Sequence, residues 1–198
     1  MNSNNTDDGL QYSEMQLIKR RFFAMRNGVV ADALRKGGVD TPIIFGLNLP
    51  QIVEIAAEQD ARPELAEQLW ADVRTRESRL LAPMVYPVEQ MSDEDAERWL
   101  MTAGNVETAD ILCHRLLRRH PHAAAIAVKL AGNDDFMVRY AALRLMLNLL
   151  SVTPAGDALD ALVKLFAPFA AIAASEVGVA RGVARQLAEE IAFLAEGQ

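Results

Sequence analysis

Cysteine is almost absent from this chain of 198 residues, and the single Cys113 cannot form a disulfide within it. No basic stretch leads into an apolar segment at the N-terminus, as a secretory signal requires. The most apolar windows, 138–152 and 159–183, are interrupted by charged residues and by Pro168. Neither offers the roughly 20 apolar residues that cross a bilayer. We therefore expect a cytoplasmic protein with no membrane role.

Several signatures of common catalytic sites are also missing, namely a phosphate-binding glycine loop, a nucleophile elbow and a His-Glu-x-x-His helix. The one cluster of metal-binding residue types contains Cys113, His114, His120 and His122. Its spacing matches no usual zinc site, and His120-Pro121-His122 is typical of a turn between helices. We expect neither a metal nor a cofactor.

The composition favours helices over sheets, because only 6% of the residues are aromatic, alanine and leucine abound, and glycine is scarce outside apparent turns. Residues 1–9 are rich in Asn and Asp and have no apolar periodicity, so we expect a disordered tail there. The remaining residues, 10–198, are predicted to form a single all-α domain with its first helix beginning near Leu10.

Helix starts recur at a regular spacing. The predicted starts of helix pairs are 29, 29 and 33 residues apart, at Pro63, Ser92, Pro121 and Pro154. The second helix of each pair is predicted to follow a residue that can cap a first turn: Thr75, Asn105, Asn133 and Ser175. Each hairpin is too small to bury its own core, so stacked hairpins are expected to form a HEAT-like solenoid with a concave face.

The net charge of −7 argues against nucleic-acid binding when taken alone, because Lys and Arg must neutralise phosphates. The charges are segregated, however. Residues 15–39 carry six basic residues against one acid, a local +5, and residues 111–156 carry six against two, a local +4. Folding could gather these blocks on one face, or they could be ordinary solvated helix faces.

One stretch, residues 45–87, combines two amphipathic helices with the anchor Leu69-Trp70 and a charged cluster of Arg74, Arg76, Glu77 and Arg79. It resembles the DNA alkylation repair family, the HEAT-like-repeat alkylpurine DNA glycosylases, over roughly residues 22–150. The resemblance implies a concave face that holds duplex DNA, with or without an alkylated base. We expect Trp70 to pack in the core and the Arg–Glu cluster to form a structural ion pair.

The resemblance also locates the family's functional positions. That family carries an aspartate four residues after a tryptophan, and here Trp99 is followed at that distance by Ala103. Alanine cannot stabilise the positive charge that develops on the sugar when an N-glycosidic bond breaks. The family's second base-flanking tryptophan has no counterpart in residues 179–187. The resemblance therefore implies DNA binding and leaves a glycosylase reaction in doubt.

The residues expected to contact DNA are one aromatic and four basic side chains: Trp99, Arg76, Arg115, Lys129 and Arg139. Two of them have an explicit structural alternative. Trp99 could instead pack in the core, and Arg139 could pair with Asp134, Asp135 or Asp110.

Two further functions remain open. The chain could be a non-catalytic scaffold that kept the fold and binds a protein partner, which its net charge and Ala103 favour. It could instead be an N-glycosidic hydrolase that uses a relocated carboxylate, with Glu107 as the candidate and Asp110 as a second choice.

Overall fold

The structure is a computed structural model that describes residues 12–174 and 176–196. The predicted tail, the predicted helix start at Leu10 and the predicted cap Ser175 lie outside the described residues. Within them the chain is all α-helical. Eleven α-helices follow one another in these residues: α1 Glu14–Ala24, α2 Gly28–Lys36, α3 Leu49–Ala57, α4 Pro63–Ala71, α5 Arg76–Val85, α6 Asp93–Met101, α7 Val106–Arg115, α8 Ala123–Leu130, α9 Phe136–Val152, α10 Asp157–Ala170 and α11 Gly178–Glu196. Three short 3-10 helices join them: η1 Val88–Gln90, η2 Leu117–Arg119 and η3 Ala171–Ala174.

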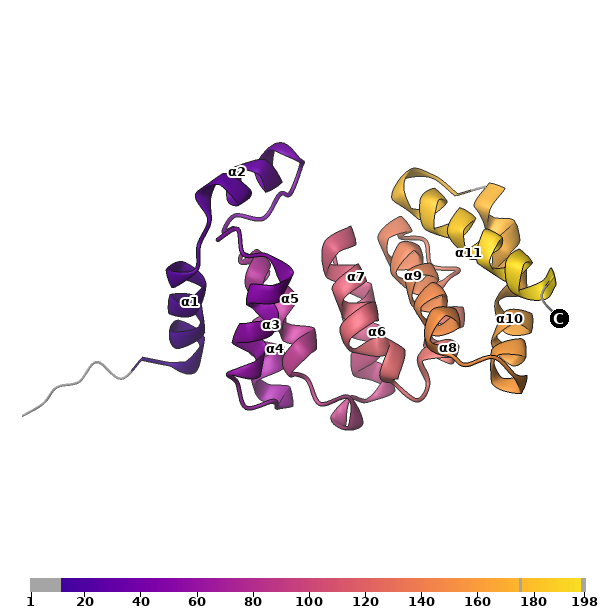
Figure 1. Cartoon of the computed structure of the whole chain (residues 1–198), viewed down its shortest axis with the longest axis horizontal. Helices are drawn as coiled ribbons and strands as arrows, with labels where there is room; N and C mark the ends of the chain where they lie inside the picture. The colour runs from indigo at the N-terminus through magenta and orange to yellow at the C-terminus, as the bar shows by residue number, and fades with distance from the viewer. Residues whose placement is uncertain (1–11, 175, 197–198) are drawn as a thin grey trace, which may run out of the picture.

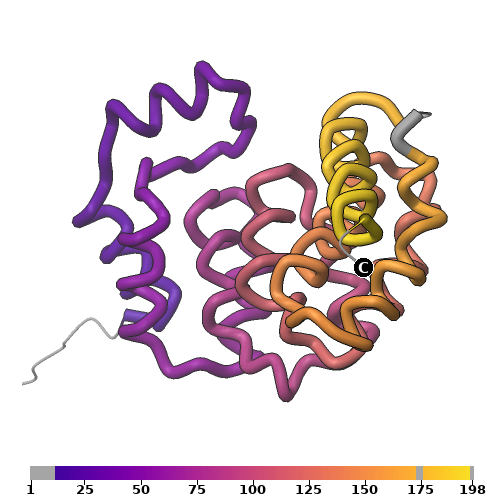
Figure 2. Tube along the Cα trace, turned by 45° about the vertical axis from the view of Figure 1, so that its right-hand side comes forward, coloured from indigo at the N-terminus to yellow at the C-terminus, as the bar shows by residue number. Residues whose placement is uncertain are grey.

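Helical hairpins lie side by side in chain order, and the predicted solenoid is confirmed. Figure 1 shows the pairs α4/α5, α6/α7, α8/α9 and α10/α11 following one another along the long axis. The second helices form a continuous row, since α5 packs on α7, α7 on α9 and α9 on α11. In Figure 2 the stack bends into an open arc, with α2 rising at one end and α11 at the other.

The capping residues explain why the starts of the helices in each hairpin were predictable. Ser92 accepts a hydrogen bond from the backbone N–H of Asp95 at the start of α6, and Asn105 does the same for Thr108 at the start of α7. Pro63 is the first residue of α4, as predicted. Thr75 occupies the cap position of α5 without a side-chain hydrogen bond to the helix. Helix starts that are marked by one capping residue or one proline were thus predicted to within about three positions.

Between α2 and α3 the chain forms a structured apolar connection, as expected, with Leu47 fully buried. A single parallel bridge joins Ile43 to Thr75, and the described residues contain no β-strand. Gly46 has φ +80, and a Cβ there would lie 2.2 Å from the carbonyl oxygen of Asn27. Only glycine allows α2 to approach this connection so closely.

Polar contacts between neighbouring repeats recur at nearly the same sequence separation. The Trp70 indole donates to Thr102, 32 residues on; Arg76 binds Glu107, 31 residues on; and Tyr140 donates to Asp110, 30 residues back. These separations match the predicted hairpin spacing of 29 to 33 residues. We call these contacts the inter-repeat ladder, and they fix the register of each hairpin on the next.

Candidate functional site

A cavity of about 1000 Å³ opens between the two ends of the arc. We call it the cleft. One wall is made by residues 34–41, at the end of α2 and in the following loop, and its floor by residues 104–111, at the start of α7. Val179 of α11 completes the lining. A smaller recess of about 190 Å³ adjoins it and shares Asp40 and Glu107 with it. The cleft therefore joins segments that are distant in sequence.

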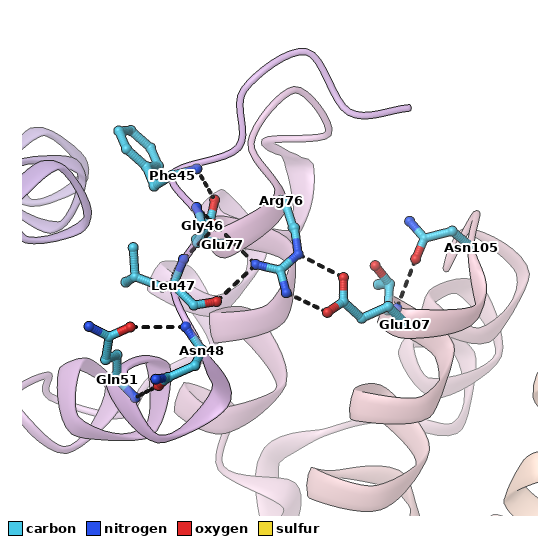
Figure 3. Close-up of polar contacts among 10 residues, drawn as sticks. Phe45, Gly46, Leu47, Asn48, Gln51, Arg76, Glu77, Asn105 and Glu107 are labelled. Carbon is cyan, nitrogen blue, oxygen red and sulfur yellow. Dashed lines mark hydrogen bonds and ion pairs between the residues drawn. The ribbon is translucent and has the colours of Figure 1, made fainter. Parts of the chain in front are cut away.

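Glu107 is held at the cleft by Arg76, as Figure 3 shows. The Arg76 Nε lies 2.8 Å from Glu107 Oε2, and Nη2 reaches the other oxygen of the same carboxylate. The third nitrogen, Nη1, donates to the Leu47 carbonyl oxygen at 3.1 Å and to Glu77 Oε1 at 3.0 Å. Every nitrogen of this guanidinium is occupied, so Arg76 holds three segments together and has none left for a phosphate.

Glu77 is the buried centre of the same network, with no exposed surface. Its carboxylate accepts the backbone N–H groups of Phe45 at 3.1 Å, Gly46 at 2.9 Å and Leu47 at 3.4 Å (Figure 3). A buried carboxylate is tolerated only where donors and a cation satisfy it, as they do here. The expected structural ion pair of this cluster is therefore present, and we call Arg76, Glu77 and Glu107 the cleft network.

Asp110 lies one helical turn beyond Glu107 and also lines the cleft. Its Oδ1 accepts the Tyr140 hydroxyl at 2.7 Å and lies 2.9 Å from the Arg144 Nε. Burial raises the pKa of Tyr140 to about 12, so the hydroxyl stays protonated and can donate. Asp110 is thus a positioned carboxylate, paired with Arg144, that lines the cleft.

Trp99 lies in the core, which does not fit the predicted base contact. It has no exposed surface, and its ring stacks on Trp70 with centroids 4.2 Å apart and an interplanar angle of 3°. Tyr86 packs edge-on against it, and its indole N–H donates to Glu67 at 2.8 Å. Both faces and the edge of the ring are used within the protein, so a base has no place to stack.

Ala103, at the position that the resemblance assigns to the family's aspartate, lies beside the cleft. It is 2% exposed in the turn before α7, and its carbonyl oxygen accepts a hydrogen bond from Arg79 at 3.0 Å. It also lines the recess of about 190 Å³ that adjoins the cleft. The carboxylates that line the cleft itself are Asp40, Glu107 and Asp110. Any carboxylate chemistry of this site would therefore come from these three residues and not from position 103.

Two of the predicted basic contacts are also engaged in ion pairs. Arg139 Nε lies 2.6 Å from Glu176 Oε1, so the ion-pair alternative holds with a partner that was not predicted. Lys129 of α8 binds Glu97 of α6 at 2.7 Å, in the row of first helices and away from the cleft. Both positive charges are therefore balanced within the protein.

The fourth basic residue, Arg115, lies in a different depression of about 380 Å³, which we call the basic groove. It lies between α3 and the ends of α5 and α7, and its lining residues are Val53, Ala56, Ala57, Met84, His114, Arg115, Arg118 and Arg119. Burial, followed by the charges of Arg118 and Arg115, lowers the pKa of His114. The sequence does not reveal this groove, because the residues that α3 contributes lie roughly 60 positions before Arg118 and Arg119.

Among the described residues, no group of three or more His, Cys, Asp or Glu side chains has a metal-binding arrangement. Cys113 is buried, and its Sγ lies 3.4 Å from the Ala141 carbonyl oxygen. In the part of the chain that the structure describes, no helix is long and apolar enough to cross a membrane.

Comparisons with known proteins agree with the fold. A family model described as DNA alkylation repair enzyme matches residues 18–169. A solved structure described as "a new family of proteins related to the HEAT-like repeat DNA glycosylases with affinity for branched DNA structures" superposes with a TM-score of 0.79. The match covers 93% of this chain and 78% of that one at 16% identity, so it shows similarity of fold alone. No curated protein matches the chain.

Proposed function

The chain belongs to the DNA alkylation repair enzyme family, and from this membership we propose that it binds duplex DNA on the concave side of its arc, with the cleft facing the bases. The observation that carries the proposal is the cleft. It is lined by α7, in the row of second helices, and by residues of α2 and α11 at the two ends of the arc. Concave faces are the usual binding surfaces of such folds. The similar solved structure is described as having affinity for branched DNA, which supports nucleic acid as the ligand class.

The charges of the cleft favour a particular kind of base. Three carboxylates line it, Asp40, Glu107 and Asp110, and the nearby cations Arg76 and Arg144 are each paired with one of them. Such a surface repels phosphates and attracts a positively charged group. A purine nucleotide alkylated at N3 or N7 carries a positive charge on its base, whereas an unmodified one does not. We therefore propose that the cleft prefers a cationic alkylated base over an unmodified one.

Fluorescence titration tests this proposal. A labelled duplex, with or without one alkylated purine, is titrated at low salt, where phosphate contacts are strongest. Binding of both duplexes, tighter for the alkylated one, supports the proposal. Asp110→Asn should reduce that preference, whereas Glu94→Gln, on the exposed outer side of α6, should leave it unchanged. Absence of binding at low salt would discard DNA as the ligand and favour the protein-scaffold alternative.

A second function, hydrolysis of the N-glycosidic bond, is favoured by one observation. Both oxygens of Glu107 are bound by Arg76, whereas Asp110 is held through its Oδ1, by Tyr140 and Arg144. A positioned carboxylate stabilises the oxocarbenium-like sugar as the base departs. Release of alkylated base that is lost in Asp110→Asn and retained in Glu107→Gln would support this function. Release no faster than the uncatalysed background would remove it.

A further inference from the structure

We propose that the basic groove binds the phosphodiester backbone of the DNA whose bases face the cleft. This inference rests on the proposed function and adds the place where the backbone is held. The groove contains three arginines and a histidine, and none of the described residues that line it is acidic. An acidic cleft cannot hold a polyanion by itself, so a DNA-binding chain with this cleft needs a separate cationic surface.

The arginines of the groove have no counter-charge, unlike three arginines of the second helices. Arg76, Arg139 and Arg144 all form ion pairs with carboxylates. Among the described residues, no carboxylate lies within ion-pair distance of Arg115, Arg118 or Arg119. Their charges therefore add together.

Neighbouring side chains do not compensate these charges. The two acids of α3, Glu54 and Glu58, are directed to Arg21 of α1. The buried Nε of Arg115 has no hydrogen-bond partner among the described residues. Arg118 Nη1 contacts His114 Nδ1 at 3.3 Å, which is a contact between two basic groups. An anion in the groove would stabilise all four groups at once, and phosphate is the anion that arginine clusters bind best.

The groove and the cleft lie on the same stripe of α7. Glu107, Asp110 and His114 follow the three- and four-residue spacing of one helix face, and Arg115 is the next residue after His114, so the acids lie in the first half of the helix and the bases in the second. Glu107 and Arg115 are eight residues apart, which is roughly 12 Å along the helix. The major groove of DNA is also roughly 12 Å wide. A backbone held in the basic groove would therefore lie about one groove width from the cleft.

A purely structural role gives a different expectation. His114 and Arg115 lie in the last turn of α7, where a positive charge stabilises the end of the helix. Neutralising such a charge would lower the unfolding temperature and would leave the salt dependence of DNA binding unchanged. Arg118 and Arg119 lie beyond the end of α7, so their removal tests backbone binding with little effect on that helix.

The experiment compares Arg118→Gln/Arg119→Gln with the unmodified chain by fluorescence anisotropy, using a labelled lesion-free duplex between 50 and 200 mM salt. Each phosphate contact contributes about 0.9 to the slope of log K against log salt. Loss of two contacts lowers this slope by about 1.8. Over this fourfold salt range, the unmodified chain should lose about tenfold more affinity than the variant.

Arg20→Gln/Lys164→Gln is the matched control, because it removes the same charge from exposed positions on α1 and α10. It should keep the slope of the unmodified chain, and thermal unfolding should show that both variants fold. If the unmodified chain binds DNA and Arg118→Gln/Arg119→Gln has the same slope, the groove is not the backbone site while the proposed function stands. If the unmodified chain does not bind at 50 mM salt, both proposals are overturned.

Discussion

Glu77→Gln should be among the most destabilising conservative substitutions in this protein, although it changes one atom. The Glu77 carboxylate is fully buried, accepts three backbone N–H groups and balances Arg76. Glutamine keeps one acceptor oxygen, but its NH2 group must face either the Phe45 amide or the amides of Gly46 and Leu47. An N–H donor would then point at another N–H donor. It also removes one of the two carboxylates that balance Arg76. Removing one partner of a buried ion pair typically costs about 3–5 kcal/mol, and we expect a loss near the lower end of that range.

Urea unfolding followed by circular dichroism measures this loss. With a slope of about 2 kcal/mol per M, the midpoint should fall by roughly 1.5 M. Hydrogen exchange should become faster at the amide of Phe45 or at the amides of Gly46 and Leu47, whichever lose their acceptor. Glu107→Gln is the matched control, because its side chain is 39% exposed and solvent screens its pair with Arg76. Its cost should be about 1 kcal/mol or less.

The reasoning would be refuted if Glu77→Gln and Glu107→Gln shifted the urea midpoint equally. Equal shifts would mean that the three amide hydrogen bonds add nothing to the ion pair. A double-mutant cycle between Arg76 and Glu77 would then show which part of the network stabilises the connection before α3.

Three further predictions concern the core, the connection between α2 and α3, and the basic groove. Duplex DNA should leave tryptophan fluorescence unchanged, because Trp99 is buried, and strong quenching would contradict this placement. Gly46→Ala should cost at least about 2 kcal/mol more in urea unfolding than Gly38→Ala, since both have positive φ but only Gly46 would place a Cβ against Asn27. Duplex DNA should raise the pKa of His114, which burial and then Arg118 and Arg115 lower in the free protein. Phosphate favours the protonated ring, so affinity should increase as pH falls through that pKa, and an NMR titration that shows no shift on adding DNA would count against the groove.

Much of the fold was predictable because its signals are local. Asn105 and Ser92 mark helix starts through hydrogen bonds to residues three positions away. The hairpin spacing follows from counting such starts, and it reappears in the inter-repeat ladder, where Trp70 contacts Thr102. The family was also predicted correctly, from the Leu69-Trp70 anchor and the charged cluster that follows it.

The site was less predictable, because it depends on which faces of distant helices meet. Arg139 was expected to contact DNA or to pair with Asp134, Asp135 or Asp110, but stacking brings it to Glu176, 37 residues away. Trp99 has polar neighbours in sequence, and its burial arises from Trp70 and Tyr86 of the preceding repeat. The basic groove needs α3 to lie beside the end of α7, an arrangement that local patterns do not specify.

The inter-repeat ladder also bears on how this arc would respond to a ligand of different width. Each polar link joins a hairpin to its immediate neighbour, through pairs such as Arg76 with Glu107 and Tyr140 with Asp110. A small rotation shared among all the hairpins changes each of these distances only slightly, yet it moves the two ends of the arc apart by the sum of the rotations. The opening of the arc can therefore vary while every contact of the inter-repeat ladder is kept.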